Sequence, residues 1–530
     1  MPDRTPAVPG IPSSVARRVA GALAFAVLAA PAFADTFTDI RYTDLVARLG
    51  AATPTGAGVV VGQIEAPENA GGSYAPNATL GEFAGKNFTL YSGTVAASGH
   101  ATEVGRNLFG NTLSIAPGTT NIHCWNVNTW IGNSYLKVGG TTVPAFPPAG
   151  MRVMNHSWIG SFGNASNDNN GLRRVDFIAN RDNLVLAVGV NNGAGTAGQP
   201  QLAYAYNTIA VGLANGNHSN SPTPAGIDGP GRRKPDIVAP GSFTSFSTPV
   251  VGAAAALLID AADSDPATIG NPNAARALTV KTVLMAGTTH RDGWSNGAAI
   301  SGAARGTTAT PLDPVYGADL LNIDRAHMIL TAGEQGGLPA AQQSFFAPAR
   351  GWDYIPSVTS GASVYWSFRV HEPIDELSAT ASWFRQVATT FASTTLQDFD
   401  LRLWKLENGV AMPLTGEAGV GVFSSGNVTS ESAIDNVEHL HVRGLAAGDY
   451  ALELVRKSGT QIAMPVAVAW YMPETEAPPA VEGDLNGDGL VNASDLAILL
   501  GAWATTGPGD LNGDGTVDAQ DLATLLGLWD

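Results

Sequence analysis

A serine at the start of one apolar segment is the residue of this chain best placed to act as a nucleophile. Ser245 lies in the run 244–249, directly before the apolar stretch 250–258. The first turn of a buried helix leaves backbone N–H groups without partners and carries the positive end of the helix dipole. Such a turn can hold a nucleophilic oxygen and a developing oxyanion side by side. We therefore expect Ser245 to open a buried helix and to act there as a nucleophile.

The residues around Ser245 resemble the serine motif of the subtilisin-like serine proteases, Gly-Thr-Ser-x-Ala-x-Pro. The segment before them, Lys-Pro-Asp-Ile-Val-Ala-Pro-Gly at 234–241, is equally typical of that family. Phe243 departs from the motif, which has glycine there, and the loop between Gly241 and Ser245 is much shorter than in the family. The resemblance implies a serine endopeptidase in which Ser245 attacks the peptide carbonyl.

The same resemblance identifies a base and an acid. Residues 99–105, Gly-His-Ala-Thr-Glu-Val-Gly, are similar to the family's histidine motif, which implies that His100 takes the serine proton and returns it to the leaving amine. The family places an aspartate after its first strand to fix the tautomer of the base. This chain has Glu65 after the strand expected at 58–64. Glutamate is one methylene longer, so its carboxylate must fold back to reach the imidazole; Glu68 is a less favoured substitute, and a decayed site is the other alternative.

The oxyanion hole of such a site should combine the Ser245 backbone N–H with a side-chain amide. Residues 184–193 resemble the family's Ala-Ala-Gly-Asn-x-Gly motif. Alignment on Gly193 implies that Asn191 is the amide donor, and Asn192 remains the alternative.

Residues 155–158, Asn-His-Ser-Trp, are similar to the strand that lines the family's specificity pocket, which implies that Ser157 and Trp158 contact substrate. The resemblance covers about residues 40–335, with its motifs in the family's order. Two other classes of protein compete with a peptidase. A protease-fold binding module would keep the fold without the chemistry. A carbohydrate-active enzyme would need a pair of catalytic carboxylates, and no such pair stands out.

The elements that must position these residues follow from the hydrophobic pattern. From about residue 58 to 332, short apolar runs alternate with helical stretches, which predicts an α/β fold with a parallel sheet covered by helices. Its active site should lie at the carboxyl ends of the strands. From about 342 to 472, several runs alternate with period two between glycine-rich turns, which predicts an antiparallel β-sandwich.

The last 48 residues contain an internal repeat, because Gly-Asp-Leu-Asn-Gly-Asp-Gly begins at both Gly483 and Gly509. A twelve-residue calcium loop presents oxygens at alternating positions and at its last position, with a glycine in sixth place for the turn. The first repeat supplies Asp484, Asn486, Asp488, the Leu490 carbonyl, Asn492 and Asp495, and the second supplies Asp510, Asn512, Asp514, the Thr516 carbonyl, Asp518 and Asp521. Carboxylates this dense repel one another unless a cation neutralises them.

An apolar helix is expected after each loop, at 494–503 and 520–529. Two such loop–helix repeats are similar to a type I dockerin, a small helical EF-hand-like module. The resemblance implies bound Ca²⁺ and a cohesin-type scaffold protein as a partner.

Composition limits the partners and the compartment. The net charge is −17, and the segment 474–530 carries eleven carboxylates with no Lys or Arg. No basic patch is visible to neutralise phosphates, so nucleic-acid binding is not expected. Two arginines at 17–18, the apolar run 19–30 and the Ala-x-Ala site at 32–34 predict a signal peptide cleaved near Ala34 and no stable membrane span afterwards; a poorly cleaved anchor is the alternative.

Cys124 is the single cysteine, so no disulfide framework is expected, and a buried, inert thiol is the favoured interpretation. An exported protein without disulfides needs another source of stability, for which bound calcium is the usual candidate. The predicted organisation is a signal peptide at 1–34, a subtilisin-like peptidase domain at 35–337, a β-sandwich at 340–473, a linker at 474–482 and the calcium-binding repeats at 483–530.

Overall fold

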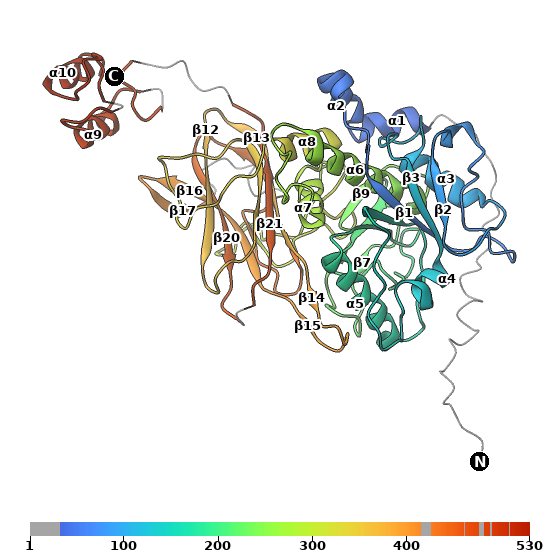
Figure 1. Ribbon diagram of the computed structural model, residues 1–530. Coiled ribbons are helices and arrows are strands. Elements are labelled where there is room, and N and C mark those ends of the chain that lie inside the picture. Colours follow the sequence, from blue (N-terminus) through green and yellow to red (C-terminus); the bar gives the residue numbers. More distant parts are fainter. Residues whose placement is uncertain are drawn as a thin grey trace.

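The computed structural model describes residues 32–414, 426–459, 462–475, 482–487, 490–507 and 509–529. Figure 1 shows an α/β unit beside a pair of antiparallel sheets, with two short helices near the carboxyl end. The expected signal segment lies outside the described residues up to position 31, and its expected cleavage motif at 32–34 falls within helix α1 (Ala32–Asp39).

The α/β unit is built on a seven-stranded sheet in the order β2-β3-β1-β4-β5-β6-β9, in which every neighbouring pair is parallel. Its strands are β1 (Val60–Glu65), β2 (Asn87–Leu90), β3 (Asn121–Asn126), β4 (Met151–His156), β5 (Val185–Gly189), β6 (Ile209–Leu213) and β9 (Ile237–Ala239). The central strands β5 and β6 are buried throughout, as expected for a parallel sheet covered on both faces. The parallel sheet predicted from the sequence is confirmed.

Helices lie around this sheet, and α6 and α7 contact it directly (Figure 1). The main ones are α2 (Tyr42–Leu49), α3 (Gly99–Phe109), α5 (Ala165–Arg181), α6 (Thr244–Ser264), α7 (Ala277–Ala286) and α8 (Ile323–Thr331). Helix α6 is apolar all round because it packs against β4, β5 and β6 on one side and α3 on another. Among the described residues α6 alone is long and apolar enough to cross a membrane, yet 83% of that apolar window is buried inside the protein, as in a core helix.

Glycine allows α3 and α6 to approach closely. A Cβ on Gly252 of α6 would lie only 2.9 Å from Cδ1 of Leu108 on α3. At the end of β5, a Cβ on Gly189 would lie 2.8 Å from Oγ1 of Thr248. Because neither glycine carries a side chain, α6 can lie close to α3 and to the carboxyl end of the sheet, where a site is expected.

The sandwich consists of two antiparallel sheets, as predicted. One has the order β11-β21-β13-β19, and the other includes β18, β16, β20 and β12. The strands are β11 (Arg350–Ile355), β12 (Ser363–Val370), β13 (Ile374–Trp383), β16 (Phe399–Glu407), β17 (Val410–Pro413), β18 (Thr429–Ser430), β19 (Val437–Leu445), β20 (Gly448–Arg456) and β21 (Val466–Tyr471). Shorter elements are α4 (Val127–Thr129), β7 (Ser221–Pro222), β8 (Arg233–Lys234), β10 (Thr307–Thr308), β14 (Gln386–Val387) and β15 (Thr394–Thr395).

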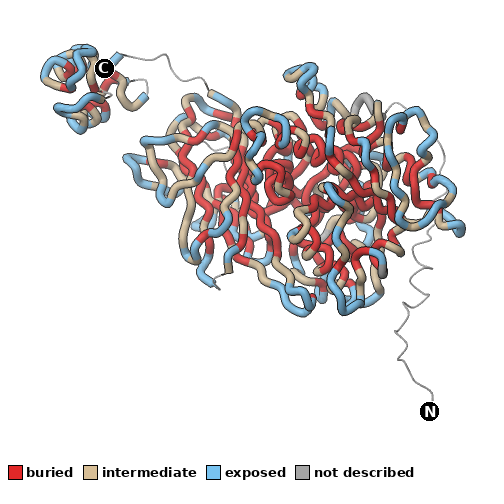
Figure 2. Tube along the Cα trace, in the orientation of Figure 1, coloured by how far each residue is buried: buried red, intermediate tan, exposed pale blue. Residues whose placement is uncertain are grey.

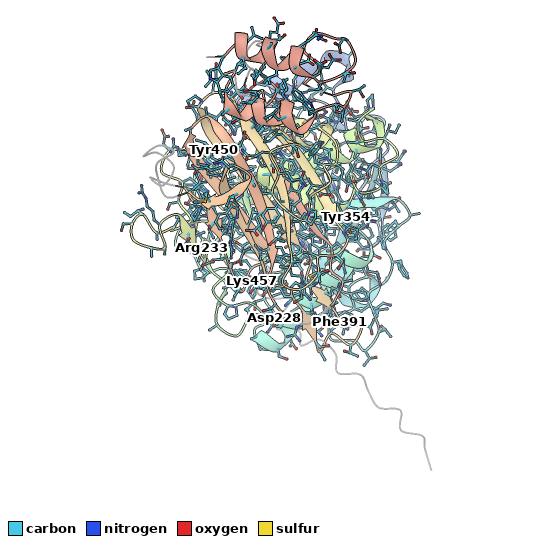
Figure 3. The ribbon with its side chains drawn as sticks, turned by 90° about the vertical axis from the view of Figure 1, so that its left-hand side faces the viewer. Asp228, Arg233, Tyr354, Phe391, Tyr450 and Lys457 are labelled. Carbon is cyan, nitrogen blue, oxygen red and sulfur yellow. The ribbon has the colours of Figure 1, made fainter. Side chains whose placement is uncertain are left out.

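The sandwich and the α/β unit share buried contacts. Trp352 of β11 and Ala467 of β21 belong to the same hydrophobic core as α6 and α7, and Figure 2 shows buried residues throughout both units. The fully buried Asp176 of α5 accepts hydrogen bonds from Arg385, which follows β13. Asp228 and Phe391, which lie near each other at the lower edge of Figure 3, are both bound by Arg173.

Strand β10 also crosses between the two units. It lies within the segment 35–337 that the sequence assigns to the peptidase domain, yet it pairs in parallel with β18 of the sandwich. The predicted domain boundary at residue 337 therefore remains a prediction, because a strand before it already pairs with the sandwich.

The carboxyl-terminal repeats form two helices, α9 (Ala493–Gly501) and α10 (Ala519–Gly527), close to the predicted positions. Their small shared core takes equivalent residues from both repeats: Val491, Leu499, Val517 and Leu525. Each helix starts with a capping box, formed by Asn492 with Asp495 and by Asp518 with Asp521.

Candidate active site

Glu65 and His100 meet at the carboxyl end of β1. Glu65 is the last residue of β1 and is fully buried, while His100 is the second residue of α3. Oε2 of Glu65 lies 2.9 Å from Nδ1 of His100, so the longer acid does reach the imidazole. The imidazole remains 24% exposed, which leaves its outer edge open toward a substrate.

Gln63 holds the other oxygen of this carboxylate, a role that sequence reasoning missed. Its Nε2 donates to Oε1 of Glu65 at 3.1 Å and to the Ala101 carbonyl at 2.7 Å. Since side chains two residues apart on a strand share a face, the spacing of Gln63 and Glu65 was the available signal. The amide ties the end of β1 to the first turn of α3 and fixes where the carboxylate points.

Glu68, the less favoured acid, has a different position. Its Oε2 accepts a hydrogen bond of 2.6 Å from the Gly99 N–H, at the start of α3. The Ser98 hydroxyl caps the same helix by accepting from the Ala101 N–H at 2.9 Å. Glu68 therefore helps to anchor the helix that carries His100, and its charge lies near the imidazole without bonding to Nδ1.

The pKa of His100 is raised from its usual value. Burial alone favours the neutral imidazole and lowers the pKa, but the charge and hydrogen bond of Glu65 and the charge of Glu68 outweigh it. The hydrogen bond to Glu65 also places the Nδ1 proton toward the carboxylate, which leaves Nε2 as the basic nitrogen.

Ser245 lies in the first turn of α6, as predicted, and is partly exposed. Phe243, the residue that departs from the family's glycine, is the residue before the helix and adopts an extended conformation with φ −140°. That backbone is open to any residue, so the side chain does not strain the turn. Its ring instead packs against Phe246, with ring centroids 6.2 Å apart.

Pro249 explains a contact of Ser157. A proline has no N–H, so the carbonyl of Ser245, four residues earlier, lacks its helical donor. The Ser157 hydroxyl supplies the hydrogen bond at 2.9 Å, and Asn155 in turn donates to that hydroxyl. Ser157, expected from the family resemblance to contact substrate, here supports the turn that carries Ser245. Trp158 is buried, with 7% exposure, and its substrate role remains a prediction.

The two asparagines after β5 differ in their partners. The Asn191 amide donates to the Ala197 carbonyl at 3.1 Å. Oδ1 of Asn192 accepts from the Thr244 N–H at 2.8 Å and from the Thr244 hydroxyl at 3.0 Å. The structure therefore places Asn192, the alternative donor, directly against the first turn of α6. Asn191 lies beside it with one amide hydrogen already bonded.

His100 and Ser245, the expected base and nucleophile, come from helices that pack together. Helix α3 contacts α6, and the His100 ring lies 5.9 Å from the ring of Phe246, the residue after Ser245. Cys124, in the neighbouring strand β3, is fully buried, and burial followed by the charge of Glu65 raises the pKa of its thiol. The thiol is buried, as expected, and its raised pKa disfavours the reactive thiolate.

The hydrogen bonds of the two loops show which oxygens of the predicted calcium ligands are already used. Asp495 accepts three backbone N–H groups, and Asp521 does the same in the second repeat. A carboxylate has about four acceptor sites, so each keeps one for a cation. The Asp510 carboxylate accepts hydrogen bonds from the backbone N–H groups of Gly513, Asp514 and Gly515, which fixes the turn of the second loop. The predicted ligand Asp488 lies outside the described residues; the others present oxygens that suit Ca²⁺.

Comparisons with known proteins match two segments of the chain. Residues 89–298 match the model of the subtilase family, a span that contains His100 and Ser245 and begins after Glu65. Residues 482–526 match the type I dockerin domain. No curated protein matches the chain. Among solved structures, a mutant of the protease domain of PatA is 17% identical and covers 54% of this chain and 99% of its own, with a TM-score of 0.37. Residues 89–298 are thus similar to the subtilase family, and residues 482–526 are similar to the type I dockerin domain.

Proposed function

We propose that the protein is a secreted serine endopeptidase with a Ser-His-Glu triad, tethered through its dockerin. The observation that carries the proposal is the 2.9 Å contact between Glu65 and His100 at the edge of the sheet where α6 begins. Subtilase-family peptidases are serine peptidases, and the matched segment contains His100 and Ser245, the base and nucleophile of this proposal. The acid is this chain's own departure from the family.

In the proposed reaction, Nε2 of His100 takes the hydroxyl proton of Ser245 as its oxygen attacks the peptide carbonyl. Glu65 holds the imidazole in the right tautomer and stabilises the imidazolium that forms. The Ser245 N–H and an asparagine amide from the segment after β5 receive the oxyanion. His100 then donates the proton to the leaving amine as the C–N bond breaks. Water attacks the acyl-enzyme carbonyl while His100 takes its proton, and His100 returns that proton to the Ser245 oxygen as the ester bond breaks and the acid leaves.

The chemistry can be tested by covalent labelling. A fluorophosphonate probe reacts only with an activated serine, so incubation with the full chain should modify Ser245, located by mass spectrometry of its peptide. Heat-denatured protein is the control, since it keeps the serine and loses the site. If neither the wild type nor Glu65→Asp is labelled, the domain is a protease-fold binding module and the proposal fails.

We further propose that the segment 1–34 exports the chain and that the calcium-loaded tail binds a cohesin, because dockerin domains bind cohesins. Each repeat exposes an equivalent apolar pair, Leu500 with Trp503 and Leu526 with Trp529. Exposed apolar residues in matching places suit a protein partner more than solvent.

Removal of calcium should unfold the tail alone. Without the ion, the loop carboxylates repel one another and the small core cannot hold α9 and α10 together. Hydrogen–deuterium exchange of the full chain in EGTA should show protection lost in both helices, and excess Ca²⁺ should restore it. Helix α6 of the same molecules is the internal control, with unchanged exchange. Protection in α9 and α10 that survives chelation would contradict the ligand assignment.

A further inference from the structure

The first turn of α6 carries an aromatic side chain that is not fully buried. Most residues of this helix from Ser247 to Ala262 are buried, but Phe246, directly after Ser245, is only partly buried. Phe243, the residue before the helix, is also partly exposed. Apolar surface gains free energy when a ligand covers it, and ligand sites are lined mainly by apolar and aromatic side chains. An open aromatic ring beside the proposed nucleophile is therefore a candidate contact for substrate.

The two phenylalanine rings extend the surface around the proposed base. The rings of Phe243 and Phe246 meet edge to face, with centroids 6.2 Å apart and an angle of 66° between their planes. On its other side, the Phe246 ring lies 5.9 Å from the imidazole of His100, tilted by 35°. Both separations lie in the range of favourable ring pairs. Phe243 thus supports Phe246, and Phe246 borders the imidazole.

The chemistry of acyl transfer determines which part of a substrate would lie beside His100. The carbonyl oxygen of the attacked peptide bond must point into the oxyanion hole, whereas the leaving nitrogen must point to the base that protonates it. The asparagines proposed for the hole follow β5, and Oδ1 of Asn192 accepts the Thr244 N–H at 2.8 Å. His100 approaches the same turn from α3. The Phe246 ring, next to His100, therefore borders the leaving amine and the residue that carries it.

The serine motif itself requires neither ring. It has glycine at the position of Phe243 and specifies no residue at the position of Phe246. Phe243 has an extended backbone with φ −140°, so the turn gains nothing from the larger side chain. Side chains that the chemistry does not need, but that border the reacting bond, are well placed to distinguish between substrates.

We propose that Phe246, supported by Phe243, selects peptide substrates with a large apolar residue, best an aromatic one, directly on the leaving-amine side of the cleaved bond. The inference rests on the proposed endopeptidase function and adds a class of substrate to it. An aromatic residue at that place would cover the exposed part of the Phe246 ring and pair with it. Glycine would make no such contact, and aspartate would lose hydration against the rings without gaining a partner.

The preference can be measured on the leaving step in reverse. p-Nitrophenyl acetate acylates Ser245, and an added amino-acid amide then competes with water for the acyl group. The amine nitrogen attacks the acyl-enzyme carbonyl and gives a proton to His100, which passes it to the Ser245 oxygen as the ester bond breaks. With the full chain, phenylalanine amide should form transfer product about tenfold faster than glycine amide, with leucine amide between them.

Variants connect the preference to the ring. Phe246→Ala should bring the phenylalanine-to-glycine ratio close to one, whereas Phe246→Leu should keep a preference for apolar amides over glycine amide. The ratio is taken within one variant, so a general loss of activity cancels. Phe146→Ala is the matched control, because that ring is 76% exposed and packs on Arg181, the last residue of α5. It should keep the ratio of the wild type.

The outcomes separate this inference from the proposed function. A wild type that turns over the ester but accepts glycine amide as readily as phenylalanine amide would overturn the inference and leave the peptidase standing. An unchanged ratio in Phe246→Ala would overturn it as well. Loss of both ester turnover and fluorophosphonate labelling in the wild type would remove the proposed function, and the inference with it. If Phe246→Ala fails to fold, the wild-type series of amides and Phe246→Leu decide.

Discussion

Ser245→Ala should lower kcat/KM for a peptide substrate by about 10⁶-fold, the largest effect expected of any single substitution in this protein. The substitution removes the oxygen that forms the acyl-enzyme and leaves the rest of α6 in place. The loss corresponds to about 8 kcal/mol of transition-state stabilisation. The measurement is hydrolysis of a fluorogenic peptide by the full chain, with the extent of folding checked by thermal melting.

Ser247→Ala is the matched control for that experiment. Ser247 lies one position beyond Phe246 in the same turn, but it is fully buried, and its hydroxyl donates to the Thr244 carbonyl at 3.2 Å. It should keep most of the activity. Because nucleophile and base act as one unit, the double variant Ser245→Ala with His100→Ala should be no slower than either single variant. Activity that survives Ser245→Ala and falls in Ser247→Ala would exchange the roles of the two serines.

The hydrophobic pattern was sufficient to predict the layers of the fold. Alternating apolar runs and helical stretches gave the parallel sheet, and period-two runs gave the sandwich, because each pattern follows from which faces of an element are buried. Strand β10 could not be predicted this way. It is only two residues long, Thr307–Thr308, and it is defined by its pairing with β18, a contact far away in the sequence.

The candidate site was predictable by residue type and less so by contact. The motifs located Ser245, His100 and Glu65, but they could not show whether the longer acid reaches the base. That depends on Gln63, which a motif does not contain. The same limit applies to Ser157, whose contact with the Ser245 carbonyl becomes understandable only once Pro249 is seen to remove a helical donor.

The contacts of His290 show the limit most clearly. The side chains of His290, Glu376 and His441 come from positions 65 or more apart along the chain, yet Oε1 of Glu376 lies 2.9 Å from Nδ1 of His290 and 3.7 Å from Nδ1 of His441. No local sequence pattern links residues this far apart. Only the packing of the sandwich on α7 and α8 brings them together.

Glu65→Gln should lower kcat/KM by about 10⁴-fold while leaving the fold intact. The amide keeps the size of the side chain, so the packing at the end of β1 is preserved. The negative charge that stabilises the imidazolium is lost, and the amide can donate to Nδ1 of His100, which favours the wrong tautomer. Peptide hydrolysis measured across pH gives both the rate and the pKa of the base.

The pH profile of Glu65→Gln has a definite sign. His100 must be neutral to take the proton of Ser245, so activity rises with pH through the pKa of His100. Glu65 raises that pKa against the effect of burial, and its removal leaves burial to lower it. The acidic limb should therefore move to lower pH although the plateau falls. Glu68→Gln is the control. The charge of Glu68 also raises the pKa of His100, so its removal should move the acidic limb slightly to lower pH. The plateau should stay near that of the wild type, because Glu68 does not bond to Nδ1 of His100. A large fall of the plateau in Glu68→Gln with little change in Glu65→Gln would assign the acid to Glu68.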